Sequence, residues 1–418
     1  MAGGGPAGFM AAISAAEAGV GGVHLLEATP ELLHKVRISG GGRCNVTHAC
    51  WDPRELAGHY PRGSRALRGP FSRFAAGDAL VWFADHGLEL VEEADGRLFP
   101  RANRSSAVID CLRRAAAAAG VQVHPSAALQ AASPAAAGGF LLQVRLQAGE
   151  DPAAGRQAVT IHAERLVLAT GSHPSGRRLA ASLGHTLVPP VPSLFTLALA
   201  GDPLLALAGV SMQAVGLSLD LPDGSRLRQR GPVLITHWGL SGPATLRLTA
   251  FAARDLQACG YRATLQVDWS GGRSAADLEV CFQQGRTAQA RRLLANWRPW
   301  PELSRRLWQH LLERAGVEPS RRWADLTRAQ QQHLLADLRG SRHRVSGRGP
   351  FGEEFVTAGG IPLGEVDLAR MESRRRPGLY LVGELLDVDG VTGGFNFQHC
   401  WSSGWLVGQA LGESRRPH

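Results

Sequence analysis

MAGGGPAGFMAAISAAEAG, residues 1–19, carries glycines at positions 3, 5 and 8 with the G-x-G-x-x-G spacing of a dinucleotide-binding loop. In such a loop one glycine makes the tight turn, one lets the backbone approach a pyrophosphate, and one lets the next helix pack closely on its strand. The small residues after the loop predict that helix. We therefore expect the loop to bind a nucleotide through Gly3, Gly5, Pro6, Ala7 and Gly8.

An acidic residue stands at the end of the next predicted strand. The run VHLLEAT predicts a short buried strand that reaches Glu27. A carboxylate about 20 residues beyond the glycines is placed to accept hydrogen bonds from the ribose hydroxyls of a nucleotide. Glycines, helix, strand and acid together predict a mononucleotide-binding unit.

A buried strand should also precede the glycine loop. In a doubly wound sheet that strand is central and directs the turn toward the pyrophosphate. Only Met1 and Ala2 stand before Gly3. We predict that these two residues cannot form the strand, and that several Val, Ile or Leu residues originally preceded Gly3.

A second glycine cluster follows in KVRISGGGRCNVTH, residues 35–48. Successive glycines let backbone N–H groups point into a concavity. Arg37 and Arg43 beside them favour an anionic or electron-rich ligand. A surface loop that binds nothing is the alternative interpretation.

Two later predicted strands end where a parallel sheet binds its cofactor, at the carboxyl edge. ERLVLATGS ends at Thr170 and Gly171, and PGLYLVGELLDVDG runs into Gly383 and Glu384. Nucleotide-binding motifs thus stand near both ends of the chain. Their positions predict a doubly wound domain interrupted by a large insertion.

A glycine turn then leads into a terminal helix that is expected to start near Asn396. The amino end of a helix carries partial positive charge and free N–H groups. Beside a flavin it would stabilise negative charge on the reduced ring. We expect changes at Gly394 or Asn396 to damage turnover more than folding.

The middle of the chain has a different pattern. From about residue 187, short apolar or alternating runs separated by Pro and Gly predict antiparallel strands. Between about 274 and 340, leucines recur at helical spacing.

Composition gives few limits on partners. The net charge is +9, but Lys35 is the only lysine and the arginines look spread over the chain. The charge alone therefore indicates no nucleic-acid partner. No apolar run is long enough to span a membrane, and a cytoplasmic location is the expectation. The six cysteines include no C-x-x-C pair, so no metal site is expected.

Several motifs together resemble the BaiN-like (YhiN-type) FAD-dependent oxidoreductases: GGGPAG, ISGGGRCNVTH, GRLFPRANRSSAVID, THWGLSGPA, VTAGGIPLGEVDLARMES and PGLYLVGELLDVDGVTGGFNFQHCWSSG. The resemblance covers nearly the whole chain. It implies an α/β fold with a Rossmann-like FAD-binding domain built from both chain ends, interrupted by a β-barrel-like insert and a small helical subdomain. The implied segments are the first part of the FAD domain (1–186), the β-rich insert (187–273), the helical subdomain (274–340), a return strand of the insert (341–356) and the second part of the FAD domain (357–418).

The resemblance also assigns residues to parts of FAD. The glycine loop and Glu27 would hold the ADP half. Residues of the second cluster would line the middle of the cofactor and its ring: Arg37, Ser39, Gly41, Gly42, Arg43 and Asn45. The ribityl chain and the isoalloxazine would meet Glu384, Asp387, Gly393, Gly394 and Asn396. The family commonly has ATGG where this chain has ATGS after its strand, which leaves the roof of the site open.

The function that these features favour is transfer of hydride through flavin N5 to a small organic substrate. Members of the family with an assigned activity point to reduction of an activated C=C bond with NAD(P)H as electron donor. His237 and His399 are the candidate proton donors. For each, a hydrogen-bonded structural histidine is the alternative.

Two rival functions remain open. A flavin disulfide reductase would use Cys44 and Cys50, although five residues separate them and such enzymes usually have four. A flavin-containing nucleic-acid-binding protein would use the Arg-rich helical insert. We favour a small-molecule substrate, with no membrane and no nucleic-acid partner; the oligomeric state stays open.

Overall fold

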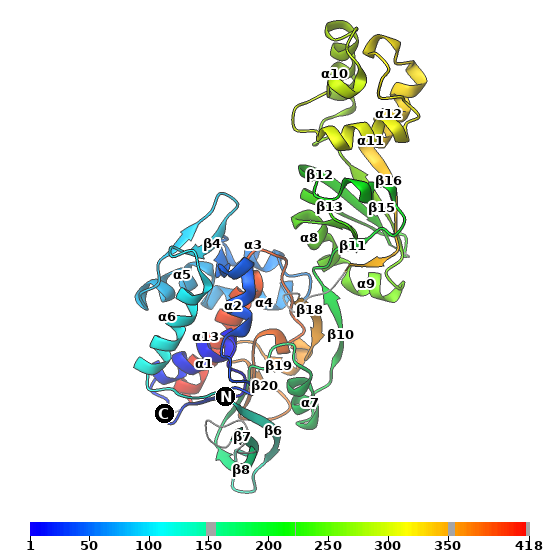
Figure 1. Cartoon of the computed structure of the whole chain (residues 1–418). Helices are drawn as coiled ribbons and strands as arrows, with labels where there is room; N and C mark the ends of the chain where they lie inside the picture. Colours follow the sequence, from blue (N-terminus) through cyan, green and yellow to red (C-terminus); the bar gives the residue numbers. More distant parts are fainter. Residues whose placement is uncertain (148–155, 222, 350–355, 415–418) are drawn as a thin grey trace. The chain divides into compact units, whose positions relative to one another are not determined.

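The computed structural model describes residues 1–147, 156–221, 223–349 and 356–414. The chain folds into two compact units. Unit 1 comprises Met1–Val191 and Val356–His418, and unit 2 comprises Pro192–Phe355. Both chain ends therefore belong to unit 1, as the blue and red ribbons of Figure 1 show. Of the expected return strand at 341–356, residues 350–355 lie outside the described residues.

Short strands form the centre of unit 1. They are β1 (His24–Leu26), β5 (Gln122–His124), β9 (Leu166–Leu168), β19 (Val366–Asp367), β20 (Glu372–Ser373) and β21 (Leu379–Leu381). β1 pairs with β5 and β9 pairs with β21, both in parallel, while β20 and β19 continue antiparallel beyond β21. Every residue of β9 and β21 is buried. This is the mixed α/β arrangement of a Rossmann-type fold.

The position between the two parallel pairs is held by the first residues of the chain. Ala2 forms a parallel bridge to Leu26 of β1 and another to Leu168 of β9. Its N–H donates to the Val167 carbonyl at 2.9 Å, and the Gly3 N–H donates to the Leu26 carbonyl at 2.8 Å. Met1 and Ala2 were predicted not to form this strand, and they form no strand of their own. Ala2 alone fills the position as an isolated bridge, because backbone hydrogen bonds need no particular side chain.

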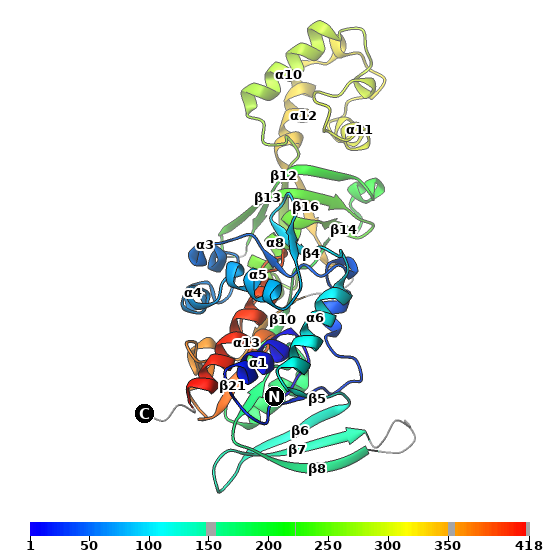
Figure 2. The ribbon, with the colours of Figure 1, turned by 90° about the vertical axis from the view of Figure 1, so that its left-hand side faces the viewer.

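The first and last helices bring the chain ends together. They are α1 (Pro6–Glu17) and α13 (Phe395–Glu413), which lie side by side in both Figure 1 and Figure 2. Two glycines of α13 make the close approach possible. A Cβ at Gly404 would lie 2.7 Å from the Ala7 carbonyl oxygen, and one at Gly408 would lie 2.3 Å from the Ser14 Cβ. The glycine loop is thereby held against the C-terminal helix.

The other elements of unit 1 surround this core. They are α2 (His34–Ile38), η1 (Ser39–Gly42), β2 (Thr47–His48), α3 (Pro53–Gly58), α4 (Ser64–Arg73), α5 (Ala76–Asp85), β3 (Leu90–Glu92), β4 (Arg97–Pro100), α6 (Ser105–Ala118), β6 (Ala127–Pro134), β7 (Phe140–Gln147), β8 (Arg156–Ala163), α7 (Pro174–Ser182), β10 (Val188–Ser193, which extends past the unit boundary), β18 (Val356–Gly360), η6 (Leu363–Glu365) and η7 (Gly383–Leu385). Across the residues described, no helix combines the length and apolar character needed to cross a bilayer.

Unit 2 is built on one antiparallel sheet. Its strands are β11 (Leu197–Ala198), β12 (Ser211–Asp220), β13 (Arg226–Ile235), β14 (Gly239–Ser241), β15 (Ala263–Asp268), β16 (Ser341–Val345) and β17 (Gly347–Arg348). Their order across the sheet is β16-β15-β12-β13-β14-β11-β17. In the described part of the chain no pairing joins β16 to β17, so the expected barrel-like closure is not confirmed.

Helices cover one face of this sheet and continue beyond it. They are η3 (Pro203–Leu207), α8 (Pro243–Phe251), α9 (Ala253–Ala258), α10 (Ala275–Ala288), η4 (Leu294–Asn296), α11 (Arg305–Arg314), η5 (Trp323–Asp325) and α12 (Arg328–Gly340). Leu217 of β12, Leu248 of α8 and Trp308 of α11 belong to one hydrophobic core cluster. The sheet therefore has an apolar face and, as shown below, an opposite polar face.

Candidate cofactor site

The three glycines of the first loop have three different surroundings. Gly3 has φ +113°, and a Cβ there would lie 2.4 Å from the Ala169 carbonyl oxygen. A Cβ at Gly8 would lie 1.9 Å from the Gly3 carbonyl oxygen. By contrast, no atom lies within 4 Å of a Cβ built on Gly5, at the N-cap of α1. Side chains are excluded at Gly3 and Gly8 by the protein itself, whereas Gly5 borders open space.

The Glu27 carboxylate is fixed at the end of β1 by backbone groups. Its Oε2 accepts a hydrogen bond from the Gly4 N–H at 2.8 Å. Its Oε1 accepts from the Thr29 N–H and from the Thr29 Oγ1, both at 2.9 Å. The carboxylate is thus held beside the glycine loop.

Predicted site residues from distant parts of the chain come together at two places. At the first, a Cβ at Gly383 would lie 2.9 Å from the Ala7 Cβ, and one at Gly171 would lie 3.8 Å from Glu384 Oε2. Lys35 Nζ lies 3.4 Å from the same carboxylate oxygen. The glycine loop, the β9 end and the β21 end therefore meet.

At the second place, the terminal glycine turn meets the second glycine cluster. A Cβ at Gly394 would lie 2.7 Å from the Thr47 backbone and 2.8 Å from Asn45 Oδ1. The His48 ring nitrogen Nδ1 lies 3.1 Å from the Gly393 carbonyl oxygen. Gly394 has φ +94°. Because any side chain at Gly394 meets backbone, we now expect changes there to impair folding as well as turnover.

Several buried polar atoms of the predicted residues have no partner. Asn45 Oδ1, Thr170 Oγ1 and both ring nitrogens of His399 are four of the ten buried side-chain polar atoms that make no hydrogen bond within the described residues. Leaving such a group unpaired costs about 1–3 kcal/mol, and most buried polar groups are paired. These residues therefore fit a site that a polar ligand completes.

Other predicted residues are already engaged with the protein. Arg37 is exposed, and its Nε lies 2.5 Å from Glu31 Oε1. Arg43 lies over the Phe99 ring, 3.9 Å from its centroid, and its Nε donates to Asn103 Oδ1 at 2.6 Å. Neither guanidinium is oriented by the structure as a dedicated anion ligand. The loop could instead bind a ligand through its backbone groups. Gly41 and Gly42 have φ +66° and +83°, and no atom lies within 4 Å of a Cβ built on either residue.

Asn396 holds the preceding loop in place. Its Oδ1 accepts from the Gly390 N–H at 2.8 Å, and its Nδ2 donates to the Gly390 carbonyl at 2.9 Å. The Asp387 N–H donates to the Ile361 carbonyl at 2.8 Å. Both ends of the Asn396 amide are used on Gly390, so its substitution is expected to loosen this loop as well as to change turnover.

The two candidate proton donors lie in different units. His237 is exposed in the turn between β13 and β14 of unit 2. His399 is buried in α13 of unit 1, where desolvation lowers its pKa to about 4. The imidazole of His399 is therefore neutral near pH 7.

We predict that His399 makes stability fall as the pH is lowered. Its folded pKa of about 4 lies below the ordinary value of 6.5, so the unfolded chain binds the proton more readily between these values. Stability is full above pH 6.5 and declines by about 3 kcal/mol on the way to pH 4. Urea unfolding at a series of pH values should show a weaker decline in His399→Gln. An identical decline in both proteins would exclude burial of a neutral imidazole as the cause.

A buried ion pair that no sequence pattern indicated lies next to the site. Arg62 donates to both carboxylate oxygens of Asp389, and the Asp389 side chain is fully buried. The two residues are 327 positions apart in the chain. The Thr47 hydroxyl also donates to Gln398 Oε1 at 2.6 Å and was missed. No local pattern marks either pair, because each depends on segments that only the fold brings together.

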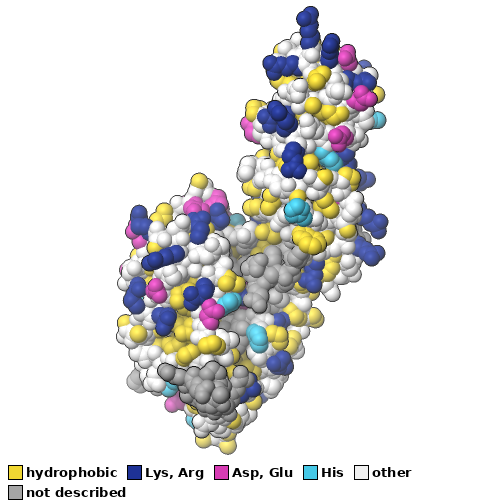
Figure 3. Space-filling view, viewed as in Figure 1, with side chains coloured by type: hydrophobic (Ala, Val, Ile, Leu, Met, Phe, Trp, Pro, Cys, Tyr) yellow, Lys and Arg dark blue, Asp and Glu magenta, His cyan; other side chains and the backbone are white. Residues whose placement is uncertain are grey.

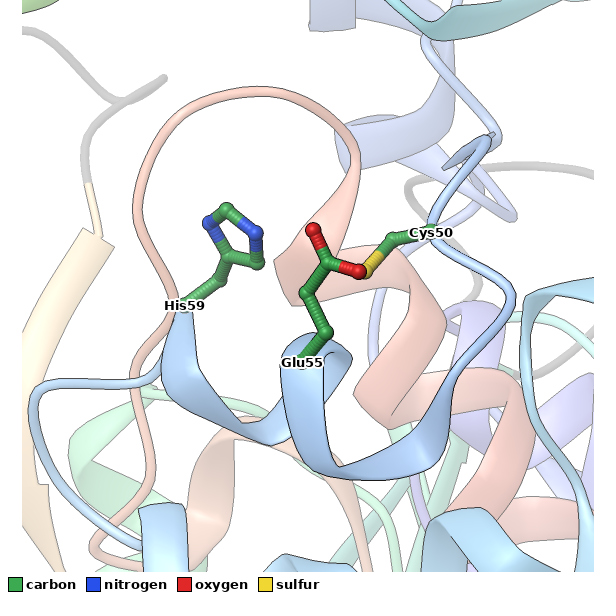
Figure 4. A group of neighbouring side chains, drawn as sticks. All are labelled: Cys50, Glu55 and His59. Atoms are coloured by element: carbon green, nitrogen blue, oxygen red, sulfur yellow. The ribbon is translucent and has the colours of Figure 1, made fainter.

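The cysteines near the site are protonated thiols. All six cysteines are free. Burial raises the pKa of Cys44 to about 12. Burial, with the carboxylates of Glu55 and Asp52, raises the pKa of Cys50 to about 11. Figure 4 shows Cys50 beside Glu55 and His59, with one potential ligand atom of each within 4.8 Å of the others.

Fold and site together define a flavoprotein of the FAD-dependent oxidoreductase class. The chain belongs to the HI0933-like family, because residues 1–410 match the HI0933-like protein Rossmann domain. It is 30% identical to a 3-dehydro-bile acid delta(4,6)-reductase from Clostridium scindens, over 98% of each chain. It is 28% identical to a ribosomal RNA dihydrouridine synthase from Escherichia coli, over 98% of this chain and 96% of the relative.

A solved structure supports the fold alone. The 3-ketosteroid delta1-dehydrogenase from Sterolibacterium denitrificans, solved with 1,4-androstadiene-3,17-dione, matches 99% of both chains with a TM-score of 0.53 and 12% identity. The predicted resemblance to BaiN-like oxidoreductases is confirmed by the family match.

Proposed function

We propose that this protein reduces an activated C=C bond, one conjugated to a carbonyl group. The names of the two relatives support this proposal. A 3-dehydro-delta(4,6) bile acid carries double bonds conjugated to a ketone, and a dihydrouridine is formed when the C=C bond beside a uracil carbonyl is saturated. One reaction type thus spans a small molecule and a nucleic acid. A small organic substrate is our first candidate.

The observation that carries the proposal is the set of unpaired atoms on predicted residues. Within the part of the chain that the structure describes, Asn45, Thr170 and His399 present buried polar atoms without a hydrogen-bond partner, and Gly5 borders open space at the α1 N-cap. When bound, FAD would supply hydride transfer at flavin N5, with NAD(P)H as electron donor.

The residues of this chain would bind and orient that cofactor. Gly3 and Gly8 set the loop, Gly5 gives access to the α1 amino end, and Glu27 accepts from ribose hydroxyls. Further cofactor-binding residues in the proposal are Pro6, Ala7, Arg37, Ser39, Gly41, Gly42, Arg43, Asn45, Thr170, Gly171, Gly383, Glu384, Asp387, Gly393, Gly394 and Asn396. We further propose that the chain is divided into the five domain segments predicted from the sequence and that the protein is located in the cytoplasm.

The two histidines would have different tasks. A neutral His399 can hydrogen-bond a polar group, but with a pKa of about 4, lowered by burial although the Gly383 backbone partly offsets this, it is seldom charged at neutral pH. We assign it to positioning. His237 is exposed and so accessible to a substrate, and imidazole is a common general acid in enzymes; we therefore propose His237 as the proton donor.

A nucleic-acid substrate is the second candidate, and the charge distribution favours it. Unit 2 contains 21 arginines and 14 acidic residues, which gives +7 of the total +9. The excess of basic over acidic residues is therefore concentrated in unit 2, whereas the composition was interpreted as an excess spread over the whole chain. The disulfide-reductase alternative loses support, because raised thiol pKa values disfavour the thiolate nucleophile.

Flavin spectroscopy tests the proposed function. Purified protein should show flavin absorbance, and anaerobic NADH or NADPH should bleach it. Addition of an enone or of a uridine-containing RNA should then restore the oxidised spectrum. A flavin that is bleached but never reoxidised by either conjugated acceptor would contradict C=C reduction.

Glu27→Ala should weaken FAD binding about 10- to 100-fold, because a hydrogen bond to a charged group contributes about 1.5–3 kcal/mol. The strand itself should persist, since Leu25 and Leu26 remain buried. Titration of apoprotein with FAD measures the change. Glu89→Ala, which removes an exposed carboxylate paired with Arg101, is the control and should leave FAD affinity unaltered. Full affinity in Glu27→Ala would remove Glu27 from the site.

Cys50→Ser should leave turnover within about twofold of the parent protein. The Cys50 thiol is protonated at neutral pH, since its pKa is raised to about 11, and serine has nearly the same shape but cannot act as a redox thiol. Anaerobic reduction followed by reoxidation measures the rate. Loss of turnover with normal flavin content would revive the disulfide-reductase alternative.

A further inference from the structure

On the polar face of the unit 2 sheet, arginines project from two strands, β13 and β16, and polar residues of β12 and β15 lie between them. Arg228 of β13 lies opposite Ser218, Ser218 opposite Gln266, and Gln266 opposite Arg342 of β16. In the next row the corresponding residues are Arg226, Asp220, Thr264 and Arg344. Adjacent strands lie about 4.8 Å apart, so the two arginine lines are about 14 Å apart. We call these two rows the open face.

The open face is separate from the hydrophobic core. Leu217, Leu219, Leu265 and Val267 alternate with the residues of the open face and are buried on the other side. Arg226, Arg228, Arg342 and Arg344 are exposed. In Figure 3, dark blue side chains appear along the edge of unit 2 where Figure 1 places β15 and β16. The face contains no apolar side chain that could enter a membrane.

Most of these cations are not neutralised by the protein. Asp220 is paired with Arg226, with 2.5 Å between Oδ1 and Nε. The side chains of Arg228, Arg342 and Arg344 have neither a hydrogen bond nor an ion pair with any described residue, and the same holds for Arg262 beside them. A hollow of about 650 Å³ is lined by Arg262, Arg342 and Arg344 among others. The face therefore has free positive charge and a concave edge.

We propose that the open face binds the sugar–phosphate backbone of double-stranded RNA. Two lines of guanidinium groups can pair with phosphates on either side of a groove. Between the lines stand Ser218, Thr264 and Gln266, whose hydroxyl and amide groups suit the 2′-hydroxyls of a wide, shallow RNA minor groove. The surface lies on the sheet and not on the helices of 274–340, where the rival function placed it. This RNA-binding surface extends the second candidate function. It rests on the proposed flavin chemistry only for the reduction of the bound RNA.

Fluorescence anisotropy with a labelled RNA hairpin of about 20 base pairs tests this surface on the full chain loaded with FAD. The test variant combines Arg228→Gln, Arg342→Gln and Arg344→Gln. The matched control combines Arg291→Gln, Arg305→Gln and Arg328→Gln, which removes the same charge from exposed positions of the helical segment. A DNA hairpin of the same sequence is the second probe.

We expect the open-face variant to bind RNA at least tenfold more weakly at about 100 mM salt. Its slope of log affinity against log salt should fall by about 2–3, one for each lost phosphate contact. The control should change less than threefold, and the parent should prefer RNA to DNA. Equal losses in both variants, equal affinity for DNA, or RNA binding insensitive to salt would overturn the proposal. Reduction of the flavin by NAD(P)H is measured on the same samples, so failure of the binding surface is distinguishable from failure of the proposed function.

Discussion

Gly8→Ala is expected to destabilise unit 1 by about 3 kcal/mol or more and to abolish FAD binding. The new Cβ would lie 1.9 Å from the Gly3 carbonyl oxygen, a backbone atom that cannot swing aside like a side-chain end. To relieve the overlap, α1 must move away from the central strand position. That movement would break the packing of α1 on α13, which depends on close approach at Gly404 and Gly408. Urea unfolding of the apoprotein and titration with FAD measure the two effects.

Gly5→Ala is the matched control and separates the two roles of the loop. A Cβ at Gly5 meets nothing within 4 Å, and the Gly5 φ of −88° suits alanine. The apoprotein should therefore keep its stability within about 1 kcal/mol, the usual cost of an alanine N-cap. Its FAD affinity should nevertheless fall, because the methyl group enters the space before the α1 amino end. If Gly5→Ala binds FAD normally, the pyrophosphate does not approach this glycine.

The parts of the site that could be predicted from the sequence are those specified locally. The Gly3, Gly5 and Gly8 spacing and the position of Glu27 each follow from one strand–turn–helix segment, and the structure places Glu27 beside Gly4 as that segment requires. The pairing of Ala2 could not be predicted. Strand formation is judged from runs of several residues, whereas here one residue bridges two strands through backbone groups alone.

Side-chain engagement was harder to predict than position. Arg37 and Arg43 were expected to line the cofactor, but in the structure their guanidinium groups contact Glu31 and Phe99. Asn396 also lies at the expected helix start, yet its amide is used on Gly390. A motif specifies which residue is near a site. Which partner a polar side chain binds depends on neighbouring residues, and their positions are set by tertiary packing.

Asp389→Asn is the second change with a large expected effect, because it leaves the Arg62 guanidinium buried without its counter-charge. The Arg62 side chain is 12% exposed and that of Asp389 is 0% exposed. Removing one partner of a buried pair costs about 3–5 kcal/mol, whereas replacing both by apolar residues is often nearly neutral. We therefore expect Asp389→Asn to lower the free energy of unfolding by about that amount, and the double variant Arg62→Met with Asp389→Leu to recover most of it.

The same change should also lower FAD occupancy, and this links the ion pair to the cofactor site. Arg62 and Asp389 form an antiparallel backbone bridge, and the Asn396 amide fixes the adjacent Gly390. The loop before Gly393 and Gly394 is thus anchored from two sides. Glu89→Gln is the control in the same unit: the Glu89 and Arg101 side chains are both more than half exposed, so its unfolding midpoint and flavin content should not change. If Asp389→Asn unfolds at the same urea concentration as the parent, the buried pair does not anchor the loop. If it is destabilised but keeps full FAD occupancy, the loop is anchored independently of the cofactor site.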